Sequence, residues 1–362
     1  MGANQSVPKN KEFWEDVVKK YRSVDEAGKD LHMHYTTVKK YVTRFNLSFP
    51  AKKATHKRTT VIEQIIQLPP VELQVYKHPI ARIGDEEEAI LHLSDGHAGK
   101  ITVSFNDDVY NMRMANIFDG VMTIITLHRK LYPIRKLHIV ITGDNVQGEN
   151  PFQGSTVGSV SMGARDQVSK IAFPAMVKLI ASLAQEFEEI IVECVAGNHG
   201  ANKIMSATNK EDLRLYDMLK VYFAPHASIK INIHETPSAI VYINGFKSFI
   251  FHGDYIKSNQ SVPLVAIKRK LTDWYIQYDR FQYAFGGHFH KRLTDEIGSR
   301  LEYFMCGTLV SDDDWAINTI GISSNPSQGL YGIHPKRGIT WRYSLQVDKN
   351  FLPEKEDKKV IK

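Results

Sequence analysis

The chain has 362 residues, of which 43% are hydrophobic, 24% charged and 10% aromatic, and its net charge is +6. This composition is typical of a folded globular protein and excludes disordered, collagen-like and low-complexity chains. No apolar run approaches the roughly 20 residues that a membrane helix needs, and the first residues lack the apolar core of a signal peptide. Two cysteines, Cys194 and Cys306, are too few for a disulfide scaffold, so we expect reduced core residues in a cytoplasmic protein that contacts no membrane.

The positive charge is concentrated at the start of the chain. Residues 1–60 hold 13 lysines and arginines against 6 acidic residues, whereas the remaining residues hold 33 against 34. A basic segment joined to a near-neutral body indicates an anionic polymer as partner, most often nucleic acid.

Three short helices are predicted near the N-terminus. Apolar residues recur at helical spacing in residues 11–22, a capping box from Ser23 to Glu26 starts a second helix, and a turn at residues 32–34 precedes a third helix over residues 35–45.

The second and third of these helices resemble the helix–turn–helix modules of bacterial and phage DNA-binding proteins. In such modules the last helix enters the major groove. A small helical bundle with a solvated basic face is the alternative interpretation. The helix–turn–helix interpretation predicts that the exposed face of the third helix contacts DNA through Thr36, Thr37, Lys39, Lys40, Thr43 and Arg44.

The rest of the chain predicts an α/β domain. We place the helix–turn–helix domain at residues 1–48, a basic linker and connecting segment at 49–87, the α/β domain at 88–348 and a charged tail at 349–362. Within the α/β domain we expect strands at 89–94, 137–142, 190–196, 239–243, 248–252 and 302–306, helices near 108–131, 163–187, 210–223 and 261–279, and further strand structure within 329–348.

Five short polar motifs follow one another, each just after or near a predicted strand. Because the carboxyl ends of strands in an α/β sheet converge on one edge, residues far apart in the sequence can meet there. Carboxylates and imidazoles together bind divalent metals such as Mn, Fe or Zn, and a pair of such ions can activate water and clamp a phosphate. The motifs are Ser94-Asp95-Gly96-His97, Gly143-Asp144-Asn145, Gly197-Asn198-His199, His252-Gly253-Asp254 and Gly287-His288-Phe289-His290.

In this order the motifs resemble those of the calcineurin-like metallophosphoesterase superfamily, including its repair-nuclease branch, over residues ~88–310. The resemblance implies a four-layer α/β/β/α sandwich with two divalent ions at the sheet edge. Mn is the metal that we expect, and Fe, Zn and Mg are the alternatives. It implies that Asp95, His97, Asp144 and His290 bind one ion, and that Asp144, Asn198, His252 and His288 bind the other.

The same resemblance implies the catalytic roles. Asp144 would bridge both ions, and a metal-bridging hydroxide would attack phosphorus. Asn198, a ligand of the second ion, is counted among the catalytic residues, and His199 would contact the phosphate or protonate the leaving oxygen.

Three features of the sequence allow more than one interpretation. The superfamily usually has an acidic residue after the histidine of the third motif, and here Gly200 stands, which bears on the orientation and basicity of His199. His252 is a single histidine after a strand and could also be a core residue. The Gly- and Ser-rich stretch 148–163 is either a loop over the substrate or a connector.

The metal centre predicts the reaction class and leaves the substrate open. Our first hypothesis is a DNA phosphodiesterase to which the basic module delivers DNA. The alternatives are a phosphatase or nucleotide phosphodiesterase that the module only localises, and a DNA-binding protein with a structural metal centre. Because helix–turn–helix modules often work in pairs, a homodimer is also open. Residues 261–280 could form a phosphate-tracking and stacking surface or an amphipathic helix packed on a sheet, through Lys268, Arg269, Lys270, Trp274, Tyr275, Tyr278 and Arg280.

Overall fold

The computed structural model describes residues 10–21, 23–49, 86–149, 159–200, 210–256, 264–278, 280–299, 301–312 and 325–348. The chain divides into two units, Met1–Arg58 and Thr59–Lys362, each with its own internal contacts.

The first unit has the helices that the sequence predicts: α1 (Lys11–Lys20), α2 (Val24–Asp30) and α3 (Tyr35–Arg44). Ser23 caps α2 by accepting a hydrogen bond from the backbone N–H of Glu26 at 3.2 Å. The ring of Trp14 is fully buried and stacks on Tyr41, with centroids 5.2 Å apart. The unit therefore has a small core of its own, made of Trp14, Val17, Tyr21, Ala27, Val38, Tyr41 and Val42.

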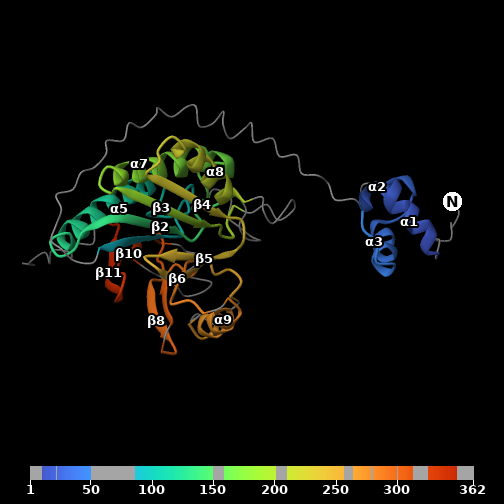
Figure 1. Cartoon of the computed structure of the whole chain (residues 1–362). Helices are drawn as coiled ribbons and strands as arrows, with labels where there is room; N and C mark the ends of the chain where they lie inside the picture. Colours follow the sequence, from blue (N-terminus) through green and yellow to red (C-terminus); the bar gives the residue numbers. More distant parts are fainter. Residues whose placement is uncertain are drawn as a thin grey trace, which may run out of the picture. The chain divides into compact units, whose positions relative to one another are not determined.

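The second unit contains two β-sheets (Figure 1). The six-stranded sheet has the order β11-β10-β1-β2-β3-β4. Strands β1 to β4 are parallel to one another, and β10 is antiparallel to both of its neighbours, β1 and β11. Its strands are β1 (Glu87–Leu93), β2 (Ile134–Ile141), β3 (Glu189–Val195), β4 (Ile229–His234), β10 (Ser327–His334) and β11 (Gly338–Gln346).

The five-stranded sheet has the order β5-β6-β7-β9-β8. Its three central strands are parallel, and the two edge strands are antiparallel to their neighbours. The strands are β5 (Ser238–Ile243), β6 (Phe246–Phe251), β7 (Tyr283–Gly286), β8 (Leu293–Ile297) and β9 (Leu301–Met305).

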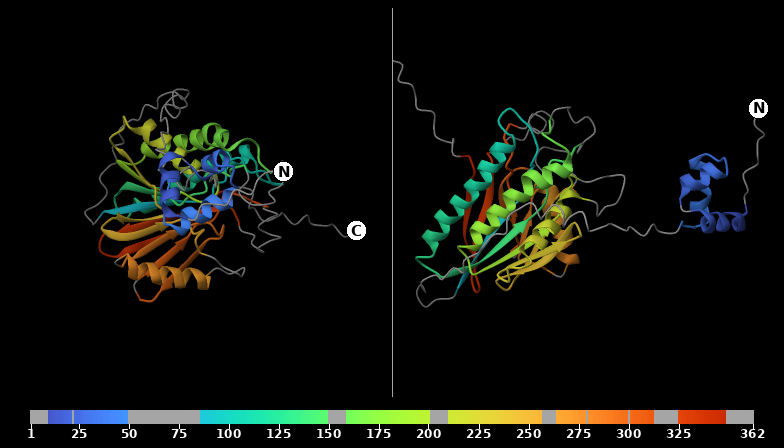
Figure 2. Two further views of the ribbon diagram at one scale, coloured as in Figure 1. Left: turned by 90° about the vertical axis from the view of Figure 1, so that its right-hand side faces the viewer. Right: turned by 90° about the horizontal axis from the view of Figure 1, so that it is seen from above.

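Successive side chains of each strand point to opposite faces of its sheet, and this alternation builds the layers of the fold. In β1, Leu91 faces the helices α5 (Asp107–His128), α7 (Phe173–Ala184) and α8 (Glu211–Phe223), whereas Ile90 packs against the other sheet. In the second sheet, Phe285 faces the first sheet and Phe249 faces α9 (Leu264–Gln277). Figures 1 and 2 show the resulting order of helices, sheet, sheet and helix. The four-layer α/β/β/α prediction is confirmed.

One helical run is more apolar than the sequence analysis expected. Ala164–Ala184 comprises α6 (Ala164–Asp166), a π-helical turn η1 (Gln167–Ala172) and α7, and by length and composition it could cross a membrane. In the fold, 67% of the most apolar stretch of this run is buried inside the second unit. It is therefore a core helix on the outer face of the six-stranded sheet.

Residues 261–280 present some of the residues named for a stacking surface and pack others inward: Arg269, Tyr278 and Arg280 are exposed. Trp274 lies 5.3 Å from Phe251 between ring centroids, and Tyr275 lies 5.7 Å from Phe281, so both rings, which are partly buried, pack against the core beneath α9. Lys268 forms an ion pair with Asp295 at 2.8 Å. The amphipathic-helix alternative describes α9.

Both cysteines are free and buried, as the sequence indicates.

Candidate metal centre

The strands bring the five motifs to one edge of the sandwich. The motifs follow the carboxyl ends of β1, β2, β3, β6 and β7. Three of these strands are neighbours in the first sheet and two are neighbours in the second. The site is therefore built from both sheets, and the polar side chains close the end of the core between them.

The backbone at this edge is unusual. Among the described residues ten non-glycine residues have positive φ, and five of them are predicted ligands: Asp95, His97, Asp144, His288 and His290, with φ between 49° and 74°. The left-handed region costs about 1–2 kcal/mol for a residue with a Cβ, so it persists where the surrounding structure imposes it. Such strain is often stored at functional sites.

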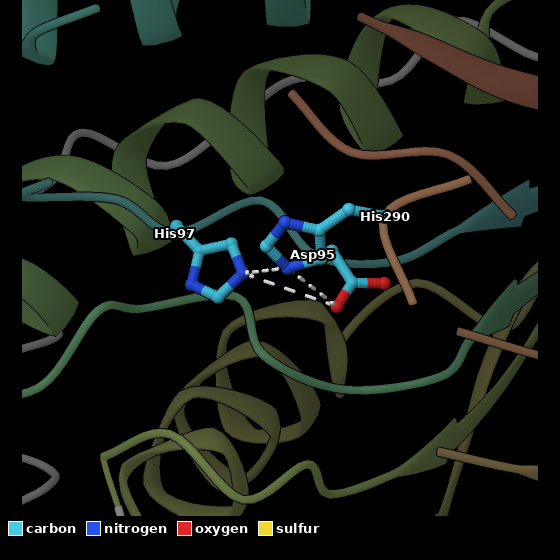
Figure 3. Close-up of side chains that lie close together, drawn as sticks. All are labelled: Asp95, His97 and His290. Carbon is cyan, nitrogen blue, oxygen red and sulfur yellow. Dashed lines mark hydrogen bonds and ion pairs between the residues drawn. The ribbon is translucent and has the colours of Figure 1, made fainter. Parts of the chain in front are cut away.

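The first ligand cluster consists of Asp95, His97 and His290 (Figure 3). The Nε2 atoms of His97 and His290 face each other at 2.9 Å. Oδ1 of Asp95 lies 3.4 Å from Nε2 of His290 and 3.9 Å from Nε2 of His97. Three ligand atoms from the segments that follow β1 and β7 thus point at a common position.

The second cluster lies around His252. Its Nε2 is 3.0 Å from Oδ2 of Asp144, 3.0 Å from Oδ1 of Asn198 and 3.3 Å from Nδ1 of His288. Its Nδ1 is 2.7 Å from the carbonyl oxygen of Thr142, and a hydrogen bond donated there directs Nε2 toward the site. The structure therefore places His252 among the predicted ligands and gives its ring a defined orientation.

Asp144 connects the two clusters. Besides its contact with His252, it has a carboxylate oxygen within 4.8 Å of a ring nitrogen of both His97 and His199. Oδ1 of Asp144 also accepts the backbone N–H of His199 at 2.7 Å. Asp144 therefore lies between the two clusters and contributes a carboxylate to both groups of ligand atoms.

His199 lies beside the first cluster. Its ring centroid is 4.5 Å from that of His97, and its Nε2 is 3.9 Å from Oδ2 of Asp144. Its Nδ1 is 3.1 Å from the carbonyl oxygen of Gln147, so Nδ1 donates a hydrogen bond and Nε2 faces the ligands. The predicted catalytic residues Asp144, Asn198 and His199 are thus together.

Burial and neighbouring charges favour the metal-binding forms of several ligands. Burial, helped by His199 and His290, holds the pKa of His97 well below its ordinary value, and burial with His252 lowers the pKa of His288 to about 3. Burial works to raise the pKa of Asp144, but His252 and His199 hold it well below its usual range.

His252 is the exception. Burial works to lower its pKa, but Asp144 and Asp95 outweigh that effect and raise the pKa to about 10. A proton on His252 and a cation would therefore compete for the same position beside Asp144.

Gly200 has a backbone conformation that residues with a Cβ rarely adopt. Its φ is +66°, and a Cβ there would lie 3.0 Å from Cβ of Glu211 and 3.1 Å from Cγ2 of Val146. The acidic residue of the superfamily pattern would be strained and crowded. The carbonyl oxygen of Gln147 orients His199 in this chain.

Two buried side chains near the ligands were missed in the sequence. Asp212, in the first turn of α8, binds backbone N–H groups of the second and third motifs. Gln167, in η1, accepts from the N–H of Gly148 at 2.8 Å and donates to the carbonyl oxygen of Met162 at 2.8 Å. No local pattern marks either, since an acidic residue in a first helical turn is ordinary.

Gln167 also bears on the stretch 148–163. The hydrogen bonds to Gly148 and Met162 join the two ends of this stretch, and the backbone N–H of Ser161 donates to the carbonyl oxygen of Gly99 at 2.8 Å. The choice between a loop over the substrate and a connector concerns residues 150–158, which lie outside the described residues.

The residues predicted to contact DNA belong to the first unit, on α3. Thr37 is half-buried, and the five others are exposed: Thr36, Lys39, Lys40, Thr43 and Arg44.

Comparison with known proteins gave matches among solved structures alone. No family model matches the chain, and no curated protein does. An archaeal phosphodiesterase is similar at 15% identity, over 71% of this chain and 99% of its own, with a TM-score of 0.35. Vacuolar Protein Sorting 29 from Cryptosporidium parvum is similar at 14% identity, over 72% and 100%, with a TM-score of 0.32. A 5'-nucleotidase from Candida albicans is similar at 11% identity, over 75% and 54%, with a TM-score of 0.34. Likeness at this level is too low to assign an activity, so the functional assignment depends on the side chains of this chain.

Proposed function

We propose that the chain is a metal-dependent phosphoric ester hydrolase with a binuclear centre, and that its substrate is the phosphodiester backbone of DNA. The observation that supports this most is the convergence of seven ligand residues from both sheets at one edge. They supply two carboxylates, one amide oxygen and four imidazoles, a set that suits Mn, Zn or Fe. The residues present fit the ions that the motifs imply.

The two sets share one carboxylate. Asp95, His97 and His290 would hold one ion, and Asn198, His252 and His288 the other, with Asp144 touching both. Two divalent cations there would make water nucleophilic near neutral pH and neutralise charge on the phosphate. His199, whose Nε2 faces the ligands, is placed to contact the phosphate or to give a proton to the leaving oxygen. Because Nδ1 donates to Gln147, Nε2 carries a proton only in the imidazolium form, and burial lowers the pKa of His199, so the proton-donor role requires the phosphate to favour that form.

Cationic residues beside the ligands support a substrate with several phosphates. Lys100 follows the first motif and lies close enough to contribute to the lowered pKa of His97 and His199. Lys291 and Arg292 are exposed and directly follow His290. Together with the basic face of α3, these charges favour a polyanion over a small ester.

Cleavage assays test the activity. Wild-type and Asp144→Ala protein are incubated with Mn²⁺ and with linear and circular DNA, single- and double-stranded, alongside a chromogenic phosphodiester. The exposed β8 carboxylate Glu296, replaced by Ala, is the control. We expect wild-type and control protein to cut DNA and the Asp144 variant to cut none. If the small diester is hydrolysed and DNA stays intact, the assignment of DNA as substrate is wrong. If no ester is hydrolysed, the assignment of the chain as a hydrolase is wrong.

A second pair of variants tests the helical unit. Lys39→Glu with Lys40→Glu reverses two charges on α3, whereas Lys11→Glu with Lys19→Glu makes the same charge change on α1. We expect the α3 variant to raise the KM for DNA at least about tenfold and to leave hydrolysis of the small diester unchanged. Equal effects of both pairs would show that only net charge matters.

A further inference from the structure

A buried carboxylate that is not itself a ligand lies directly behind the candidate metal centre. Asp212 is fully buried in the first turn of α8. Its Oδ2 accepts the backbone N–H of Asp144 at 2.8 Å and that of Gly197 at 2.9 Å. Its Oδ1 accepts the backbone N–H and the side-chain amide of Asn145, at 3.0 and 2.9 Å.

These four hydrogen bonds bear on the protonation state of the Asp212 carboxyl group. Each oxygen receives two N–H donors, which occupies the acceptor positions of both oxygens and leaves none for a proton. The four donors favour the carboxylate form of Asp212, whereas burial and the neighbouring Asp144 raise its pKa above the ordinary value. A buried carboxylate with this many charge-assisted hydrogen bonds is rigid, and losing one partner is costly.

The donors belong to two different loops. Asp144 and Asn145 follow β2, whereas Gly197 follows β3 and directly precedes Asn198 and His199. The loops touch, since a Cβ on Gly143 would overlap the backbone nitrogen of Gly197. The single oxygen Oδ2 thus fixes one loop against the other at the point where both carry ligands.

Tyr216, one turn further along α8, holds the same loops without adding charge. Its hydroxyl donates to the carbonyl oxygen of Val195 at 3.0 Å and accepts from the side-chain amide of Asn145 at 2.8 Å. It therefore provides a matched comparison for a test of the carboxylate.

We propose that Asp212 is a positioning residue of the metal centre, which fixes Asp144 relative to Asn198 and His199 and adds negative charge behind the carboxylate shared by the two ions. The proposal rests on the metal centre proposed above. Groups that orient metal ligands in this way typically change metal affinity 10–100-fold when they are replaced.

Mn²⁺ binding to the metal-free full chain tests this inference by equilibrium dialysis and by the electron paramagnetic resonance signal of the coupled ion pair. In Asp212→Asn an NH₂ group faces two N–H donors, so one pair of bonds is lost. We expect affinity to fall about 10–100-fold and the coupled signal to weaken at equal occupancy. Tyr216→Phe should bind within about threefold of wild type, because the carboxylate stays.

A second variant covers the case in which Asp212→Asn does not fold. Asn145→Ser removes one donor to Asp212 and keeps the charge, so we expect a loss of about three- to tenfold. Wild-type affinity and signal in a folded Asp212→Asn, or in Asn145→Ser where the first variant is unfolded, would overturn the inference alone. Absence of Mn²⁺ binding by the wild-type protein would overturn the metal centre, and the inference with it.

Discussion

Replacing Gly200 by alanine tests whether the departure from the superfamily pattern is a backbone requirement. Gly200 has φ +66° and follows the candidate catalytic His199. We expect Gly200→Ala to lower the free energy of unfolding of the second unit, because the new Cβ is both strained and crowded.

The magnitude has two parts. A residue with a Cβ in the left-handed region costs about 1–2 kcal/mol. The Cβ would also lie 3.0 Å from Cβ of Glu211 and 3.1 Å from Cγ2 of the buried Val146, so one of them must move. Overpacking of this kind typically costs about 1–3 kcal/mol, which makes the expected total about 2–5 kcal/mol.

Gly298 separates these parts. It has φ +62°, and a Cβ there would have no heavy atom within 4 Å. Gly298→Ala should therefore lose only the strain of about 1–2 kcal/mol, and the gain from a stiffer unfolded chain is common to both variants. Urea unfolding of metal-free protein, followed by far-ultraviolet circular dichroism, gives both values. Equal losses in the two variants would refute the crowding argument, and no loss in either would refute the strain argument.

Three further predictions concern metal, the helical unit and acid. Removing divalent ions with a chelator should lower the thermal midpoint of the second unit, and Mn²⁺ should restore it, as calorimetry would show. A thermal midpoint that the chelator does not change would contradict the proposed metal site. Trp14→Ala should cost the first unit about 3–5 kcal/mol and leave hydrolysis of the small diester unchanged, which paired calorimetry and kinetics would show. Burial works to raise the pKa of Glu88, but His138 and Lys136 hold it below the ordinary 4.5. Ionised Glu88 therefore stabilises the fold above pH 4.5. This contribution to the free energy of unfolding is lost as the pH falls through the lower pKa of Glu88 in the folded protein. Glu88→Gln should therefore flatten the pH dependence of the free energy of unfolding below about pH 4.5 and leave it unchanged above that pH, as urea titrations would show, and an unchanged slope below it would contradict the assignment.

The ligands could be found in the sequence because each belongs to a short motif after a strand. The strands themselves were recognisable where apolar runs were long, as in β2 and β3. Three strands were missed. β7 has only four residues, β4 has a charged or polar residue at every second position, and β8 has three polar or charged residues in a row, so none of them has the pattern of a buried strand.

Residues whose importance depends on distant partners could not be found in this way. Asp212 lies 68 positions from Asp144, and nothing near it in the sequence indicates that two loops will donate to it. Trp274 was open to two interpretations because an aromatic residue on an amphipathic helix looks the same whether it stacks on a base or fills a core. Its contact with Phe251 shows that the ring packs against the core.

The division of the ligands between two sheets also has a kinetic consequence. Asp144 follows a strand of the first sheet, and His252 follows a strand of the second, more than a hundred positions later. An ion held between them can bind only after both sheets have formed and docked, which is late in folding for contacts of such long sequence separation. Bound ions should therefore slow unfolding far more than they accelerate folding, and loaded protein should be long-lived even where its equilibrium stability is ordinary.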